Sequence, residues 1–481
     1  MKTTPRPYQL AEYERTKDRA SWALWWDQGT GKSKVIIDTL AHLWRAGRVD
    51  GLVVLAPGGV EANWIYDEIP KHLDDDIPWE ALLWSSKRRK TQKFRRRVQE
   101  VLDSPGLQVL AISYDGIMVD DGAKLTRRWL DDHRCLYVAD EATAIKTPNA
   151  KVTKRVLASA KYAAYRRLLC GTPVEDGPFD LYAQARWVDP SVWERRGINN
   201  FSHFKGRYGM WVQCKLRKSK RSFPKLTRYQ NLDDLQECLF EVGTRVRKED
   251  VLSDLPPKTY EKIYFDLSPA QWRVYRDLAD GYADLGDGKG ATAELAIVQM
   301  TRRQQVTSGF VPADDEEGLV WIGDRNPRMD ALATAVSTIP PSDQMIIWAK
   351  YNMEIDSVAA WLRERKISYC IYDGRVPTED RQRAKQDYQA GKFRVFLAKT
   401  RAAGKGLTLT AASHVIYFST YFSGDYRRQS EDRAHRIGQT RSVRYIDLVA
   451  RDTVDEDIMS ILRQKRERSS YLTKDPSPDW I

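Results

Sequence analysis

Two series of short apolar runs, separated by stretches with the spacing of amphipathic helices, dominate the pattern of hydrophobic and polar positions. The first series lies at residues 22–26, 51–56, 107–113, 136–139 and 167–170, and the second at residues 345–349, 369–372, 394–398, 414–418 and 444–449. Apolar runs of this length predict buried strands, and the helices between them predict right-handed crossovers. We therefore predict an α/β fold with two doubly wound parallel sheets.

The stretch between the two series has a different character. It is basic with helical spacing, and it contains a glycine-rich turn at residues 281–290 and an acidic loop at residues 314–317. A chain of 481 residues is too long for one compact core. We expect four segments: a first lobe, a helical insertion that also connects the lobes, a second lobe and a C-terminal tail, at residues 1–189, 190–325, 326–460 and 461–481.

Charge and composition narrow the class of partner. The net charge of +12 and the pI near 9.2 indicate a polyanion, most simply nucleic acid, although charge that only maintains solubility is the alternative. The five cysteines form no C-x-x-C pair, which argues against structural zinc or disulfides and for a reducing compartment. No apolar stretch reaches membrane length, and the first residues lack the apolar core of a signal peptide. We expect a cytoplasmic protein with no membrane partner.

A glycine-rich segment near the N-terminus has the chemistry of a phosphate-binding loop. Its glycines let backbone N–H groups approach phosphates, its lysine neutralises them, and its hydroxyl holds Mg²⁺. The residues concerned are Gly29, Thr30, Gly31, Lys32 and Ser33. The strict pattern has a glycine where this chain has Trp26, and a plain glycine turn between helices is the alternative. An apolar run before the loop and helical spacing after it favour the phosphate loop.

Two adjacent acids, Asp140 and Glu141, end one of the predicted strands. A buried parallel strand delivers side chains in this way at the carboxyl edge of its sheet. We expect Asp140 to hold Mg²⁺ and Glu141 to activate the attacking water. An ordinary strand that leaves the core into a polar loop is the alternative, and the phosphate loop upstream argues against it.

Two arginines near the C-terminus complete the candidate ATP chemistry. Arg433 and Arg436 lie three residues apart, so on a helix they would share a face. Arginines that reach a γ-phosphate from another lobe act as arginine fingers. We expect an ATP site that is divided between two lobes.

These segments together resemble the Swi/Snf family of helicase-like ATPases, within helicase superfamily 2, over nearly the whole chain. The compact phage and bacterial members are the nearest in type. The most diagnostic similarity is the stretch between the lobes at residues 245–252 and 255–258, which ordinary DEAD-box proteins lack. The other matching segments lie at residues 6–9, 56–64, 113–115, 140–143, 170–173, 399–410 and 432–439.

The resemblance implies two RecA-like lobes, ATP and Mg²⁺ as cofactors, and roles for further residues. Gln9 would contact adenine, Gly406 would lie at the nucleotide, and Gly171, Thr172 and Gln429 would couple hydrolysis to lobe movement. The implied DNA contacts are Pro57, Asn63, Ser113, Tyr114, Thr400 and Arg401. The chain departs from the family pattern at several positions: Asp27 stands for the usual Glu, Thr143 for His or Gln, Ala403 for Gly and Lys405 for Leu.

Two basic runs offer further phosphate contacts. Residues 87–97 carry eight Lys or Arg in eleven positions, and residues 215–221 carry five in seven. The first run has two possible roles: its residues contact phosphates, or they form a solvated surface whose like charges repel one another. For the second run we favour DNA, through Lys215, Arg217, Lys218, Lys220 and Arg221.

We therefore expect an ATP-driven translocase on double-stranded DNA. A strand-separating helicase and a DNA-binding switch that hydrolyses ATP without moving are the alternatives. Phage or host proteins of replication, recombination or restriction are the expected partners, in a bacterial or phage-infected cytoplasm at the nucleoid.

Overall fold

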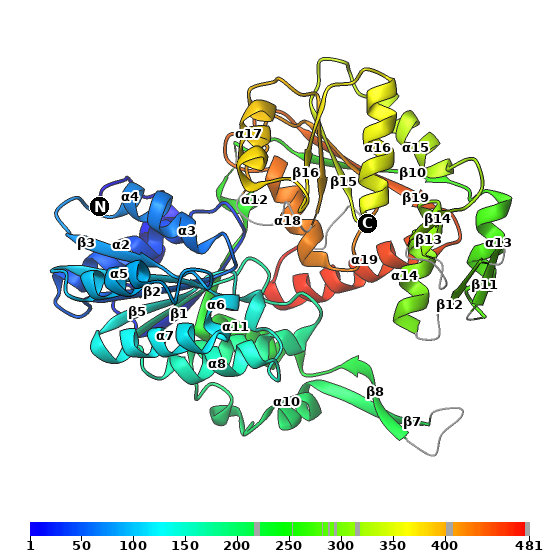
Figure 1. The fold of residues 1–481 in the computed structure, drawn as a ribbon. Helices are drawn as coiled ribbons and strands as arrows, with labels where there is room; N and C mark the ends of the chain where they lie inside the picture. Colours follow the sequence, from blue (N-terminus) through cyan, green and yellow to red (C-terminus); the bar gives the residue numbers. More distant parts are fainter. Residues whose placement is uncertain are drawn as a thin grey trace. The chain divides into compact units, whose positions relative to one another are not determined.

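The computed structural model describes residues 1–215, 222–252, 254–280, 282–286, 289–292, 296–312, 318–400 and 407–476. The chain forms two compact units (Figure 1). Unit 1 contains Met1–Ser253 and Lys465–Ser477, and unit 2 contains Asp254–Gln464. The stretch 190–325 is therefore shared between the units.

Unit 1 is built on a seven-stranded sheet in which all neighbouring strands are parallel. In spatial order its strands are β3 (Trp79–Leu83), β4 (Leu107–Ser113), β2 (Gly51–Ala56), β5 (Cys135–Ala139), β6 (Tyr165–Leu169), β1 (Ser21–Trp26) and β9 (Gly243–Val246). The five strands predicted in this half are confirmed. The edge strands β3 and β9 were not predicted.

Helices cover both faces of this sheet, and each face has its own apolar core. One core contains residues of α1 (Pro7–Thr16), α2 (Lys32–Arg45), the π-helix η1 (Trp64–Glu68) and α4 (Ile69–His72). The other contains residues of α5 (Gln92–Leu102), α6 (Tyr114–Met118), α7 (Asp120–Asp132), α8 (Lys151–Ala160), α9 (Leu181–Val188), α10 (Phe201–Tyr208) and α11 (Leu232–Val242). Short helices α3 (Glu61–Asn63) and α12 (Lys248–Val251) and a hairpin of β7 (Gly209–Lys215) and β8 (Ser222–Tyr229) complete the unit.

Unit 2 repeats the architecture with a six-stranded parallel sheet. In spatial order its strands are β10 (Lys258–Phe265), β19 (Val443–Ala450), β18 (His414–Tyr417), β15 (Met345–Ala349), β17 (Val395–Lys399) and β16 (Tyr369–Tyr372). One face carries α13 (Pro269–Asp277), α14 (Ala296–Thr307), α15 (Pro327–Ser337), α16 (Asn352–Glu364) and the start of α19 (Val454–Thr473). The other carries α17 (Thr378–Gln389) and α18 (Gly424–Ala434). The prediction of two parallel α/β sheets is confirmed.

The stretch 190–325 contains strands as well as the expected helices. It supplies one edge strand to each sheet, β9 and β10. It also forms the hairpin β7–β8, the pair β11 (Tyr282–Gly286) and β12 (Lys289–Thr292) at the glycine-rich turn, and the pair β13 (Phe310–Pro312) and β14 (Leu319–Trp321). Edge strands are easily missed from sequence because they need no continuous apolar run. The acidic loop 314–317 lies outside the described residues.

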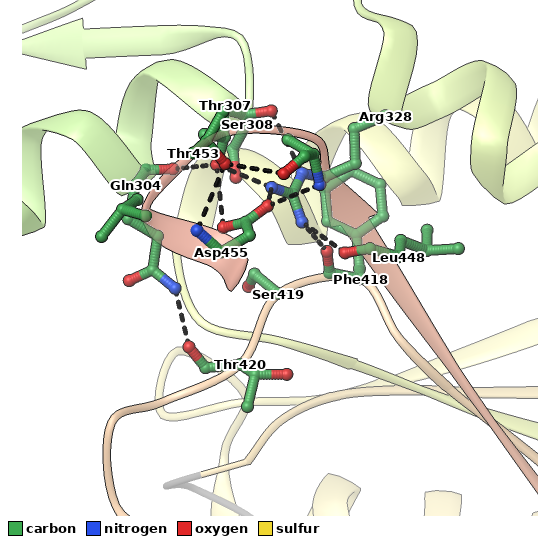
Figure 2. A network of polar contacts seen from close by, with 12 residues as sticks. Gln304, Thr307, Ser308, Arg328, Phe418, Ser419, Thr420, Leu448, Thr453 and Asp455 are labelled. Atoms are coloured by element: carbon green, nitrogen blue, oxygen red, sulfur yellow. Dashed lines mark hydrogen bonds and ion pairs between the residues drawn. The ribbon is translucent and has the colours of Figure 1, made fainter. Parts of the chain in front are cut away.

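A buried ion pair joins five elements at one end of the unit 2 sheet (Figure 2). Arg328, near the start of α15, is 1% exposed and pairs with Asp455 at the start of α19. Its guanidinium also donates to the carbonyl of Leu448 at 3.2 Å, and to the carbonyl and hydroxyl of Thr307 at 3.1 and 2.6 Å. The carbonyl of Phe418 accepts a further bond. The pair thus fixes α14, α15, α19, β19 and the end of β18 to one another.

None of the helices in the described part of the chain combines the length and the apolarity that crossing a membrane requires.

Candidate nucleotide and nucleic-acid sites

The predicted phosphate loop connects β1 to α2 and needs its glycines for two reasons. Gly29 and Gly31 have φ of 79° and 78°, a left-handed conformation that strongly favours glycine. A Cβ on Gly31 would lie 2.2 Å from Nε2 of Gln9, so a side chain there would displace the Gln9 amide. Strand, glycine loop and helix follow one another as the sequence predicts.

Helix α1 supports this loop through two side chains on one carbonyl. The hydroxyl of Tyr8 donates to the carbonyl of Thr30 at 2.7 Å, and Nε2 of Gln9 donates to the same oxygen at 3.0 Å. Oε1 of Gln9 accepts from the backbone N–H of Arg6 at 2.9 Å, which orients the amide. The sequence predicts that Gln9 contacts adenine. The structure adds that Gln9 supports the loop.

Lys32 and Ser33 lie in the first turn of α2, where backbone N–H groups and the helix dipole favour an anion. Nζ of Lys32 donates to the carbonyls of Trp26 and Asp27, at 2.9 and 3.1 Å, so its charge lies inside the loop. The hydroxyl of Thr30 closes the loop by donating to the carbonyl of Asp27 at 2.7 Å. A flexible ammonium, a hydroxyl and a helix N-terminus together suit a phosphate group and its Mg²⁺.

The two predicted acids follow β5. Oδ2 of Asp140 accepts from the indole Nε1 of Trp64 at 3.0 Å, and Oδ1 accepts from the backbone N–H of Glu141 at 2.9 Å. Burial raises the pKa of the Asp140 carboxyl, and the Trp64 hydrogen bond opposes that rise. Glu141 has φ of 48°, an uncommon conformation for a residue other than glycine. Its Oε1 accepts from Nε2 of Gln28 at 3.2 Å, which joins the acids to the phosphate loop.

The strand order explains why these parts meet. Strands β5, β6 and β1 are neighbours in the sheet, and all three point their carboxyl ends to the same edge. Gly171, just after β6, lies against the loop, because a Cβ there would be 3.4 Å from the carbonyl of Trp26. Thr172 beside it is buried. Such an edge is where ligands bind in open α/β sheets.

The supporting roles of two residues were not predicted from the sequence. Trp64 holds Asp140 as described above. Arg245, on β9, is paired with Asp27 at 2.7 Å and with Asp475 at 2.7 Å, and it donates to the carbonyl of Trp25 at 2.7 Å. Asp27 also accepts from the backbone N–H of Lys248 at 3.0 Å. The resemblance singled out the stretch 245–252, but only the sheet order shows that it fixes the start of the phosphate loop.

The first lobe's predicted DNA contacts lie beyond the ends of β2 and β4. Pro57 is buried and Asn63 is half-buried at the end of α3. Ser113 caps α6 by accepting from the backbone N–H of Gly116 at 2.9 Å. Tyr114 is buried, and its hydroxyl donates to the carbonyl of Asp140 at 2.9 Å. Tyr114 therefore connects this surface to the candidate metal-binding acid.

Arg433 and Arg436 lie together in unit 2, though not on one helix. Helix α18 ends at Ala434, so Arg436 lies beyond it. Both guanidinium groups nevertheless donate to the carbonyl of Leu407, at 3.2 and 3.3 Å. The expectation of a shared helix face is wrong, because His435 leaves the helical conformation, but the two charges converge. The side chain of His435 has a structural role, because its Nε2 is hydrogen-bonded to the carbonyl of Pro256 at 2.7 Å.

A buried ionic network that the sequence did not reveal holds α18 in place. Arg427 is 2% exposed, forms ion pairs with Asp447 and Glu431, and lies 3.6 Å over the ring of Tyr417. Glu431 also pairs with Lys258 of β10 at 3.2 Å. Nε2 of Gln429, the predicted coupling residue, donates to Asp425 at 2.7 Å within the helix.

The remaining predicted residues lie at or beyond the described parts of the chain. Thr400 is buried just after β17. The backbone of Lys215 ends β7. The other predicted residues fall outside the described part of the chain: Arg217, Lys218, Lys220, Arg221, Arg401 and Gly406.

Comparison with known proteins gives these features a family. Residues 14–309 match the family described as the SNF2-related domain, and residues 328–438 match the helicase conserved C-terminal domain. The chain is 25% identical over 448 residues to the mouse DNA annealing helicase and endonuclease ZRANB3, covering 89% of this chain and 38% of that protein. It is 27% identical over 377 residues to the uncharacterized ATP-dependent helicase MG018 of Mycoplasma genitalium, covering 78% and 33%.

A third relative, the zebrafish chromodomain-helicase-DNA-binding protein 1-like, is 26% identical over 469 residues, covering 95% of this chain and 42% of that protein. The chain thus spans less than half the length of these relatives. Among solved structures, the Sulfolobus solfataricus SWI2/SNF2 ATPase core in complex with dsDNA is 20% identical, with a TM-score of 0.42 and coverage of 99% of this chain and 94% of that one. Because the SNF2-related match alone extends over more than half of the chain, this protein belongs to the SNF2-related family of helicase-like proteins.

Proposed function

We propose that this protein is an ATP-dependent translocase that moves along double-stranded DNA and displaces bound factors. The observation that carries the proposal is the edge of the unit 1 sheet, where a phosphate loop and a pair of acids are joined by the bond from Gln28 to Glu141 at 3.2 Å. The family membership and the basic charge of +12 support DNA as the track.

The residues of unit 1 divide the chemistry of hydrolysis. The N-terminus of α2 and Lys32 bind the phosphates. Ser33 and Asp140 would hold Mg²⁺, which neutralises charge on the phosphates. Glu141 takes a proton from the attacking water, and Gln28 orients the Glu141 carboxylate for that step. Gln9 binds the adenine while it supports the loop at Thr30.

Unit 2 supplies positive charge. Arg433 and Arg436 act as arginine fingers on the γ-phosphate of the nucleotide that unit 1 binds. Gly171, Thr172 and Gln429 transmit the state of the nucleotide, and Gly406 contributes to nucleotide binding. Hydrolysis then alternates the grip of the two units on DNA phosphates. The proposed contacts are Pro57, Asn63, Ser113, Tyr114, Lys215, Arg217, Lys218, Lys220, Arg221, Thr400 and Arg401.

The first experiment measures ATP hydrolysis without nucleic acid and with single-stranded DNA, duplex DNA or RNA. Duplex DNA should stimulate hydrolysis most, and affinity for it should fall steeply with salt because phosphate contacts release counterions. A strong preference for RNA would overturn the choice of track.

The second experiment separates the translocase from a helicase and a switch. ATP hydrolysis should displace a triplex-forming third strand or a roadblock protein from duplex DNA, and it should leave a simple forked duplex largely paired. Robust fork unwinding would favour the helicase. Duplex-stimulated hydrolysis without displacement of either obstacle would favour the switch.

The third experiment tests the assigned residues. Glu141→Gln should retain ATP binding but lower turnover by orders of magnitude, whereas Lys32→Ala should weaken both. Glu194→Gln, at an exposed acid of the same unit, is the matched control and should behave like the parent protein. A Glu141→Gln variant with nearly normal turnover would show that another residue activates water.

The fingers are tested in the same way. Arg436→Ala should lower DNA-stimulated turnover about 10³-fold with little effect on ATP affinity. Arg365→Ala changes an exposed arginine of the same unit and is the control. If both variants retain full turnover, the two-unit mechanism is wrong.

A further inference from the structure

Among the residues that the structure describes, the β3 edge of the unit 1 sheet pairs with no further strand. Strand β3 is hydrogen-bonded to β4 and ends the spatial order of the sheet. The carbonyl of Pro78 accepts from the N–H of Leu107 at 2.9 Å, and the N–H of Trp84 donates to Ala111 at 2.9 Å. Backbone groups alternate in direction along a strand. The odd-numbered residues of β3 therefore direct their backbone N–H and C=O groups to the open edge.

This open edge forms the floor of a groove. A cavity of about 830 Å³ lies along residues 79–85 and is bounded by Ile65 and Tyr66 of η1 on one side and by Phe94 of α5 on the other. The helices η1 and α5 cover opposite faces of the sheet, because their residues belong to its two different cores. The cavity is thus a slot beside the edge strand, with a helix from each layer as a wall.

The two walls differ in chemistry. On the η1 side, Tyr66 is 67% exposed and Trp79 is half-buried, so that wall is aromatic. On the α5 side the cavity is lined by Arg88, Lys93 and Arg97. Arg88 and Lys93 have no acidic partner within the described residues. Of the described residues that line the cavity, Glu80 alone is acidic, and it already pairs with Arg97.

We propose that this slot, here called the β3 groove, binds an extended acidic peptide segment of a partner protein, which adds a strand to β3. The added strand would place alternate side chains on opposite faces. Apolar residues would face Tyr66 and Trp79, and acidic residues between them would face Arg88 and Lys93. This inference does not depend on the proposed DNA translocation.

The backbone pattern favours a peptide over nucleic acid. An exposed strand edge offers N–H donors and C=O acceptors in alternation, and another peptide backbone matches both. A nucleic-acid backbone offers phosphate acceptors and would leave the carbonyls unmatched. In the structure the edge carbonyl of Ala81 accepts a hydrogen bond from Nη2 of Arg97 at 3.3 Å, and the backbone N–H of an added strand would take the place of that donor.

The test uses the full-length protein and a short fluorescein-labelled peptide that alternates glutamate with valine, followed by fluorescence anisotropy. Two control peptides keep the composition: one has its glutamates and valines in separate blocks, and one is N-methylated on alternate residues to remove backbone donors. We expect saturable binding of the alternating peptide and about tenfold weaker binding of both controls.

Protein variants locate the site. Ala81→Pro removes an outward-facing N–H from an edge strand, where proline is tolerated, and should weaken peptide binding about tenfold. Arg88→Glu with Lys93→Glu should weaken the acidic peptide and not a lysine-valine peptide. Lys151→Glu with Lys154→Glu, on α8, is the matched control for charge. Circular dichroism confirms that each variant is folded.

Several outcomes would overturn the proposal. One is the absence of saturable binding by the alternating peptide. Another is equal binding of the N-methylated peptide. A third concerns binding of a single-stranded oligonucleotide. If the Arg88 and Lys93 reversal abolished that binding while Ala81→Pro had no effect on peptide binding, the groove would be a nucleic-acid surface.

Discussion

The buried pair of Arg328 and Asp455 allows a quantitative prediction for unit 2. Arg328→Met keeps much of the side-chain volume but removes every donor. The carbonyls of Thr307, Phe418 and Leu448 then each lose a hydrogen bond. The Asp455 carboxylate loses its ion pair and keeps hydrogen bonds from uncharged donors, such as the N–H of Ala450 at 3.1 Å. Breaking one side of a buried pair costs about 3–5 kcal/mol.

Hydrogen exchange measures this loss within unit 2. Amides of β18 and β19 should exchange about 150- to 5000-fold faster in Arg328→Met, while amides of α2 in unit 1 should be unchanged. Arg365→Met changes an arginine that is 47% exposed in the same unit and should cost no more than about 0.5 kcal/mol.

A double-mutant cycle tests the reason for the loss. Asp455→Asn alone should also destabilise unit 2, because it leaves the Arg328 charge buried without its partner. The double variant should be less destabilised than the sum of the two single variants by about 1–3 kcal/mol. Additive effects, or a loss below about 1 kcal/mol for Arg328→Met, would refute the view that this pair holds the elements together.

Three further predictions concern single side chains. Gly31→Ala should weaken ATP binding at least about tenfold, because its Cβ would lie 2.2 Å from Nε2 of Gln9, whereas Gly47→Ala has the same kind of backbone, φ of 64°, with nothing within 4 Å and should leave ATP binding intact. Trp64→Phe removes the hydrogen bond to Asp140 and should raise the Mg²⁺ concentration needed for half-maximal ATP hydrolysis about tenfold or more. Trp187→Phe, whose indole N–H has no partner among the described residues, is its control, and an equal shift in both would contradict the reasoning. Burial lowers the pKa of Lys350 from 10.5 to about 8, so the unfolded chain binds more protons between these values and stability rises with pH through that window. Lys350→Met should remove this rise. In urea unfolding, the free energy of unfolding of the parent should therefore increase between about pH 7 and pH 10 by about 2 kcal/mol more than that of the variant. An identical pH dependence of the two proteins would contradict this prediction.

Local patterns determined most of the secondary structure and the chemical parts of the candidate site. The apolar runs that become β1, β2, β4, β5 and β6 are visible in the sequence because a central strand is buried on both faces. The phosphate loop can be recognised in the sequence because two of its positions adopt a left-handed conformation that favours glycine, and these are Gly29 and Gly31. The resemblance to a known family rested on these same short segments.

The tertiary structure alone decided which distant residues meet. Trp64 reaches Asp140 across 76 positions of the chain, and Arg245 reaches Asp27 across 218. No local pattern carries this information, because the strand order places β9 beside β1 and β3 at an edge. Apolar periodicity reports only the burial of a segment, whereas the partners of a polar side chain depend on how all the segments pack. The open β3 groove and the buried Arg328 pair are therefore properties of the assembled fold.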